Sequence, residues 1–153
     1  MVRDIVTVKT EEGKKILSTA CSKVSTKDAA SIVKDLIDTA NYHNNSEDEE
    51  TRRSCCGLAA NQIGENKAVF IYRDQDGNWR HMINPVIINK SREVIESKEG
   101  CMSMDGVSIV NRHRAIEVFY QKIGSGRTYK EVFSGFTATI IQHEYDHLKG
   151  ILI

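Results

Sequence analysis

Two histidines near the end of the chain are spaced so that they could bind one metal ion. They lie in the stretch Gln142-His143-Glu144-Tyr145-Asp146-His147, and the apolar residues around it predict a helix. In a helix, the four-residue step from His143 to His147 turns through about 400°, so the two imidazoles lie within roughly 40° of one another. Glu144 lies about 60° from His147, which suits a carboxylate that reaches a metal-bound water rather than the metal. The pattern indicates a metal site with a general base.

A third ligand must come from elsewhere, because a catalytic site of this kind has three protein ligands and leaves one position for water. Cys101 is the best candidate, since it lies between Gly100 and Ser103 in a tight segment where the backbone can approach a bound group. Considered alone, a cysteine is more often a small buried hydrophobic residue. Paired helical histidines are likewise often ordinary core or surface residues, so the motif alone does not decide between the two interpretations.

Length and composition predict one compact domain, residues 1–153, without a polyanionic partner. The 153 residues suffice for one core and are too few for two domains of usual size. Lysine plus arginine and aspartate plus glutamate both total 21, so no net charge points to nucleic acid or an acidic membrane. The opening residues lack the charged and then apolar segments of a signal peptide, and no apolar run is long enough for a membrane span. We therefore expect a cytoplasmic protein with reduced cysteines.

An amphipathic helix is predicted early in the chain. Ser25 or Thr26 can serve as its N-cap, and Asp28 suits the positive end of the helix dipole. The apolar stripe consists of Ala29, Val33, Leu36, Ile37 and Ala40, which indicates core packing. Residues 41–53 turn polar and charged without a period, which predicts an exposed loop. Residues 2–24 allow no firm assignment.

Short β-segments follow, and then a late helix that carries the histidines. Strands are predicted at 68–72, 79–83, 86–89, 94–98, 108–110, 115–120 and 128–133, with Asn84-Pro85 breaking the second from the third. The late helix follows Gly135, is closed by Gly150, and should pack on the sheets through Phe136, Ile140 and Ile141. The expected fold class is α+β, with antiparallel β-sheets packed around the late metal-binding helix and the amphipathic helix preceding them.

Three stretches together resemble the signature motifs of the peptide deformylases, in the order that this family has. They are Gly57-Leu58-Ala59-Ala60-Asn61-Gln62, Glu99-Gly100-Cys101-Met102-Ser103 and Gln142 to His147. The resemblance covers the chain from about Gly57 to its end. It implies a metal held by Cys101, His143 and His147, with Glu144 as the general base. The implied reaction removes the formyl group from the N-terminal formyl-methionine of nascent polypeptides and releases formate.

The resemblance also implies the residues that contact the substrate. The Gln62 side-chain amide and the backbone N–H of Met102 would stabilise the oxyanion of the tetrahedral intermediate. The Gly57 backbone would align the peptide as an added strand, and Cys56 with Ile140 would form part of the methionine pocket. Glu99 and Arg112 are assigned to the substrate-binding region as well, with Glu99 expected to orient the backbone or Arg112.

The expected cofactor is Fe²⁺, and thiolate with imidazole would also accept Zn²⁺, Ni²⁺ or Co²⁺ in purified protein. The expected partners are formyl-methionyl nascent peptides and the ribosome, for a monomer that binds no specific nucleic acid and no membrane. Cys55 stands where the family usually has glycine, Asn61 stands where proline is common, and the charged loop before Cys55 is longer than usual.

These departures motivate one alternative, a weakly active homologue that binds formyl-peptides. A second alternative is a metalloprotease of the H-E-x-x-H kind. Its third ligand would normally be a histidine or glutamate downstream, and none of the six residues after His147 is suitable.

Overall fold

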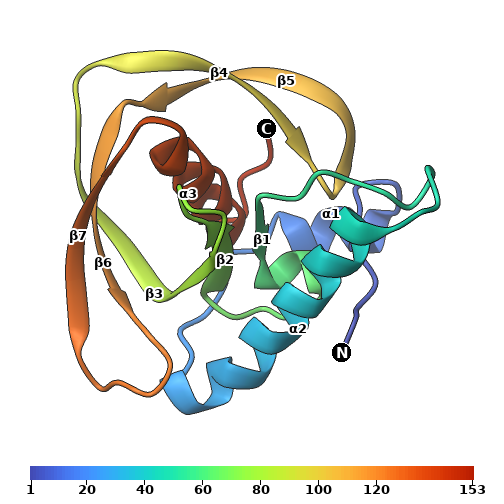
Figure 1. The fold of residues 1–153 in the computed structure, drawn as a ribbon, viewed down its shortest axis with the longest axis horizontal. Helices are drawn as coiled ribbons and strands as arrows, with labels where there is room; N and C mark the ends of the chain where they lie inside the picture. The colour runs from blue at the N-terminus through green and yellow to red at the C-terminus, as the bar shows by residue number, and fades with distance from the viewer.

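The fold surrounds one helix with β-structure on two sides (Figure 1). The computed structural model describes all residues from Met1 to Ile153. The helices are α1 (Glu11–Leu17), α2 (Thr26–Asn45), a short 3₁₀ turn η1 (Ala60–Ile63) and α3 (Gly135–Leu148). The strands are β1 (Gly57–Ala59), β2 (Val69–Arg73), β3 (Trp79–Lys90), β4 (Val94–Cys101), β5 (Met104–His113), β6 (Ala115–Gln121) and β7 (Thr128–Ser134). None of the helices has both the length and the hydrophobicity that a membrane-spanning helix requires.

All paired strands are antiparallel. Five form one sheet in the order β1-β2-β3-β6-β7, whereas β4 and β5 pair only with each other as a ribbon. In Figure 1 the sheet curves around α3, the ribbon arches over the same helix, and α2 lies on the far side of β1 and β2. The predicted α+β class, with antiparallel sheets around a late helix, is confirmed.

Strand β2 is buried on both faces and separates two halves of the core. Val69 and Ile71 face the cluster built on α2, whereas Phe70 and Tyr72 face the cluster built on α3. Successive side chains of a strand point to opposite faces, so a strand covered by a helix on each side is apolar throughout. This explains why Val69 to Tyr72 lacks an alternating pattern, and it fixes α3 firmly against the sheet.

Helix α2 begins where the sequence predicts and ends later. The Ser25 side chain accepts a hydrogen bond from the backbone N–H of Asp28 at 3.0 Å, as expected of an N-cap. The predicted loop at 41–53 is shorter, because the helix continues to Asn45. Its last turn is held by Asn44, whose amide donates to the Cys55 carbonyl at 3.0 Å and accepts from the Cys55 N–H at 2.8 Å.

One assignment along the chain is wrong, and one helix had no assignment. The predicted break at Asn84-Pro85 is wrong, because β3 continues through it with a shift of register between Ile83 and Val86. Asn84 adopts a φ of 51°, and its side chain bonds both the N–H and the carbonyl of Val24. The bulge therefore absorbs the proline without ending the strand. Helix α1 lies within residues 2–24, for which the sequence predicted no element.

The anchoring of α3 also differs from expectation. Phe136 is 71% exposed, so its predicted packing on the sheets is wrong. Ala138, Ile141 and Leu148 are buried in the core instead. Ile140 is only partly buried, at the edge of the same cluster.

Candidate metal centre

A cleft of about 400 Å³ opens beside α3. One side is formed by residues 53–57, which lead into β1, and the other by β4 and the start of β5. His143, Glu144 and Cys101 line its inner part. The residues that the three sequence motifs contribute thus meet in a single cleft.

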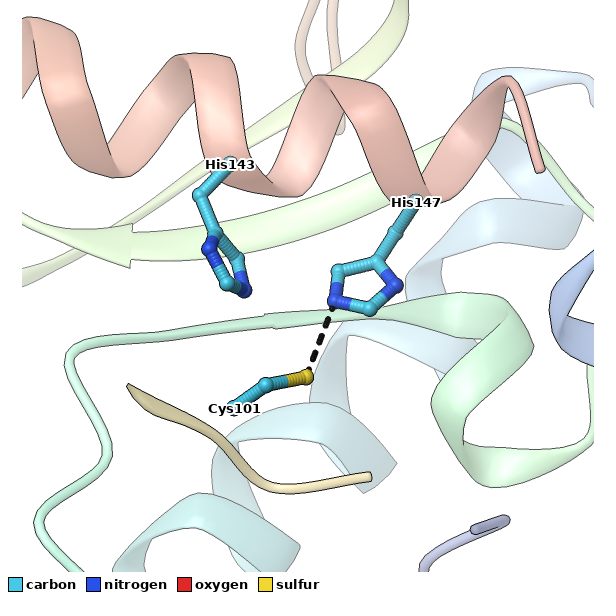
Figure 2. Close-up of side chains that lie close together, drawn as sticks. All are labelled: Cys101, His143 and His147. Carbon is cyan, nitrogen blue, oxygen red and sulfur yellow. Dashed lines mark hydrogen bonds between the residues drawn. The ribbon is translucent and has the colours of Figure 1, made fainter. Parts of the chain in front are cut away.

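The side chains of Cys101, His143 and His147 point toward one another (Figure 2). One ligand atom from each lies within 4.8 Å of the other two. The Cys101 Sγ lies 3.3 Å from the Nε2 of His147, and the two imidazole rings are 5.0 Å apart. A thiolate with two imidazoles is a donor set that suits a divalent transition metal. The geometry therefore fits the metal site that the histidine spacing predicts.

His143 is oriented by a carboxylate on β4. Its Nδ1 lies 2.9 Å from Glu99 Oε1, which leaves Nε2 for a metal. Arg112, which is 5% exposed, donates to both Glu99 oxygens at 2.9 and 2.7 Å. It also donates to Asp146 Oδ2 at 2.6 Å. This buried network ties the β-ribbon to α3 beside the His143 imidazole.

The charges of this network follow from burial and pairing. Burial alone would raise the pKa of Glu99, but hydrogen bonds from Arg112 and His143 outweigh it and lower that pKa to about 2. Burial lowers the pKa of His147 to about 3, so its ring is neutral, as a metal ligand must be. Burial also disfavours the charged form of His143, yet hydrogen bonds with Cys101 and Glu99 raise its pKa to about 10. Metal binding would therefore displace a proton from His143.

Glu144 is buried next to the His143 imidazole. It is 3% exposed, and its Oε1 lies 4.0 Å from His143 Nε2. Its Oε2 has no hydrogen-bond partner. Burial raises its pKa to about 7, with the charge of His143 opposing that rise. A carboxyl group with a pKa near neutrality can both accept and return a proton.

Glycine at position 57 allows the strand to pass close to this carboxyl group. A Cβ there would lie 2.8 Å from Glu144 Oε1 and 3.0 Å from Ile140 Cγ2. Both contacts are shorter than real Cβ atoms comfortably make, so a side chain would displace one of its neighbours. Gly57 thus brings the backbone of β1 against the inner wall of the cleft.

Two hydrogen-bond donors lie beside Cys101. The Nε2 of Gln62 is 3.6 Å from Cys101 Sγ and donates to Ser103 Oγ at 3.1 Å. The Gln62 Oε1 accepts from the Ala59 N–H at 3.0 Å, which fixes the orientation of the amide. The backbone N–H of Met102 donates to no protein acceptor. Both donors thus lie next to Cys101 in space or in sequence.

The structure places most of the predicted residues at the cleft. Gly57, Cys56, Ile140, Glu99, Gln62 and Met102 all line it. Arg112 does not, because its guanidinium is buried against Glu99 and Asp146. The sequence-based assignment missed Asp146, Ser103 and Asn61, whose amide donates to the His147 carbonyl at 2.7 Å. All three lie inside the motifs, but nothing in their type or spacing shows which atom each contacts.

The Cys55 side chain does not require the backbone conformation of glycine. Asn84 is the only residue other than glycine with a positive φ, so Cys55 lies in a region that any residue adopts. Cys55 is 3% exposed within the α2 half of the core, and its Sγ donates to the Gly57 carbonyl at 3.2 Å. The departure from the family pattern is therefore accommodated without backbone strain.

A buried carboxylate beside two imidazoles and a thiol, at the inner end of an open cleft, is the arrangement of a metal-dependent hydrolase. The sequence model of the family described as polypeptide deformylase matches residues 2–153. The chain therefore belongs to the polypeptide deformylase family, hydrolases that act on the N-formyl group.

Curated relatives and solved structures agree with this assignment. A peptide deformylase of Clostridium beijerinckii is 41% identical over 133 residues, which cover 86% of this chain and 89% of the relative. A peptide deformylase of Dictyoglomus thermophilum is 35% identical over 155 residues, which cover 100% of this chain and 91% of the relative. The Met-Ala-Ser-bound crystal structure of a class I type b peptide deformylase from Acinetobacter baumannii superposes with a TM-score of 0.83 at 27% identity. That alignment covers 99% of this chain and 97% of the other. The metalloprotease alternative finds no support.

Proposed function

We propose that this chain removes the formyl group from the N-terminal formyl-methionine of nascent polypeptides and releases formate. The observation that carries the proposal is the convergence of Cys101, His143 and His147 beside the buried Glu144, within a deformylase-family fold. Residues 1–153 would form one catalytic domain, since the two halves of the core share β2.

Cys101, His143 and His147 would hold the metal ion. A divalent metal in such a site supplies Lewis acidity, which lowers the pKa of water and polarises a carbonyl oxygen. Fe²⁺ is the proposed resident ion, by resemblance to the family, and Zn²⁺, Ni²⁺ and Co²⁺ suit the same donor set. Glu99 and Arg112 would act on the metal site rather than on the peptide, by fixing the tautomer and orientation of His143.

Glu144 would be the proton carrier of the reaction. Its raised pKa and its unpartnered Oε2 equip it to take a proton from the attacking water and later to give it to the departing amine. The tetrahedral oxyanion would be stabilised by the Gln62 amide and the Met102 N–H, each worth on the order of 3 kcal/mol. The fixed orientation of Gln62 supports this role because a preorganised donor needs no rearrangement during the reaction.

The peptide would lie along β1, with the Gly57 backbone pairing with it as with an added strand. Cys56 and Ile140, both at the cleft, would form part of the pocket for the methionine side chain. The Acinetobacter baumannii structure in complex with Met-Ala-Ser supports a peptide with N-terminal methionine as the ligand of this cleft. Nascent chains in the cytoplasm, at the ribosome, are the proposed source of such peptides.

The decisive test is formate release from formyl-Met-Ala-Ser by protein purified without oxygen and loaded with Fe²⁺, Ni²⁺ or Co²⁺. We expect release that depends on metal and stops when a chelator removes it. A metal-loaded, folded protein that releases no formate would overturn the proposal.

One observation favours the second candidate, a homologue that binds formyl-peptides and turns over weakly. The Gly57 carbonyl, which an added strand would use, already accepts a bond from Cys55 Sγ. Binding of formyl-Met-Ala-Ser without release of formate would identify this function.

A further inference from the structure

The mouth of the cleft carries basic side chains on both sides. Arg53 lies on the segment that leads into β1, and Lys98 lies on β4. The two acidic residues of the cleft, Glu99 and Glu144, lie at its inner end, where Glu99 is neutralised by Arg112 and Glu144 is buried. The inner end and the mouth therefore differ in charge, although the whole chain has a net charge of zero.

The positive charge at the mouth is only partly compensated. Lys98 forms no ion pair. Arg53 has one acidic neighbour, Asp105, at 3.9 Å, and Asp105 also lies 3.4 Å from Lys9. One exposed carboxylate thus faces two cations, while Lys98 remains unpaired. Glu96 shares the exposed face of β4 with Lys98 but does not line the cleft.

Arg53 and Lys98 both line this cleft, Arg53 from the segment before β1 and Lys98 from β4, so a peptide that leaves the cleft would lie near both cations. If formyl-methionine lies at the inner end, as the proposed function on which this inference rests requires, the following residues leave through the mouth. We infer that this enzyme prefers polypeptides with an aspartate or glutamate in the first few positions after formyl-methionine. Arg53 and Lys98 are the specificity-determining residues, and Asp105 is the carboxylate that an acidic substrate would displace from Arg53.

The expected preference is moderate and depends on salt. Exposed ion pairs contribute little each, so two of them favour an acidic over a basic peptide by about threefold to tenfold in kcat/KM. The Debye length falls from about 10 Å at 0.1 M salt to about 3 Å at 1 M. The preference should therefore shrink as salt is added, whereas cleavage of a neutral peptide should change less.

The test compares formate release from formyl-Met-Ala-Asp-Ser, formyl-Met-Ala-Ser-Ser and formyl-Met-Ala-Lys-Ser, all as C-terminal amides so that no terminal carboxylate contributes. A second series moves the aspartate to the positions before and after. The variants are Arg53→Glu, Lys98→Glu and both together, with the matching glutamine variants in case a charge reversal impairs folding. Lys130→Glu, exposed on β7 and away from the cleft, controls for the change in net charge.

The wild type and Lys130→Glu should cleave the aspartate peptide fastest, and the double variant should lose or reverse this order. The metal-free protein should show the same order of affinities for the unformylated peptides. Equal rates for the acidic and basic peptides, or a preference that survives in the double variant, would overturn the inference while leaving the proposed function intact. No release from any peptide would overturn both.

Discussion

The side-chain amide of Asn61 donates a hydrogen bond to the backbone carbonyl of His147 over 2.7 Å. Asn61 lies on the 3₁₀ turn η1, and His147 lies in the last turn of α3, so the bond ties a proposed metal ligand to a separate element. Proline, which is common at this position in the family, could not donate such a bond. In this chain the Asn61 side chain thus restrains the position of His147.

Removing this restraint should weaken metal binding more than folding. Asn61→Ala should lower the affinity for Co²⁺ by about tenfold, the lower end of the range for groups that orient a ligand. The free energy of unfolding should fall by only about 1 kcal/mol, because His147 O still accepts from the Gly150 N–H. Co²⁺ titration and urea unfolding measure the two effects. Asn89→Ala, which removes an exposed amide bonded to Glu117, is the control. Unchanged Co²⁺ affinity in Asn61→Ala would refute the role.

Gly57→Ala should reduce turnover without unfolding the protein. The added Cβ would lie 2.8 Å from Glu144 Oε1, so the carboxyl group has to move. A misplacement of about 1 Å in a catalytic group can cost about 100-fold in rate. Steady-state kinetics with formyl-Met-Ala-Ser should show a lower kcat, and Gly126→Ala, where a Cβ meets nothing, should match the wild type. A wild-type kcat in Gly57→Ala would show that Glu144 tolerates the displacement.

Glu144→Gln should retain metal and lose activity. The side chain keeps its size but can no longer accept a proton, and general-base catalysis typically contributes about 100-fold to 10,000-fold. The three proposed ligands are unchanged, so metal content per chain should equal that of the wild type. Metal analysis and formate release are the two measurements. Metal loss in Glu144→Gln would mean that this carboxylate is a ligand and that its assignment as the base is wrong.

Local patterns predicted much of this fold. The apolar stripe of α2 and the step from His143 to His147 both depend on one helical period, which the sequence displays directly. The same period led to the wrong expectation that Phe136 packs on the sheets. Phe136, Ile140 and His143 lie on one stripe of α3, and that stripe lines the cleft rather than packing on the sheets. Periodicity shows which residues share a face but does not show what the face contacts.

The charged network behind the site could not be predicted from spacing. Arg112 joins Glu99 on the paired strand β4 to Asp146 on α3, over sequence separations of 13 and 34 residues. Only the register of β4 with β5 and the docking of α3 bring these groups together. The resemblance placed Arg112 in the substrate-binding region, and its burial now makes it a residue that positions His143 through Glu99.

His81 should make stability depend on pH. Burial lowers its pKa, with the charge of Lys122 adding to the effect, and its Nε2 accepts the Ile123 N–H at 3.0 Å. The unfolded chain takes up a proton near pH 6.5, while folded His81 stays neutral, so stability is lost as pH falls through about 6.5 and levels off below the folded pKa. Urea unfolding at about pH 7.5 and about pH 5 should show a smaller loss for His81→Gln than for the wild type. Equal losses would show that other groups carry the pH dependence.

Cys55→Ala should bind substrate more tightly at some cost in stability. The Cys55 thiol donates to the Gly57 carbonyl, which the proposed substrate strand would also use. Without the thiol this carbonyl is available to the peptide N–H, so the KM for formyl-Met-Ala-Ser should fall with little change in kcat. Loss of a buried sulfur should lower the free energy of unfolding by about 1 to 2 kcal/mol. Cys55→Ser retains a donor at the same place and should keep the KM of the wild type. If the KM of Cys55→Ala is unchanged or higher, the thiol does not compete with the substrate, and the unusual residue at position 55 acts only in the core.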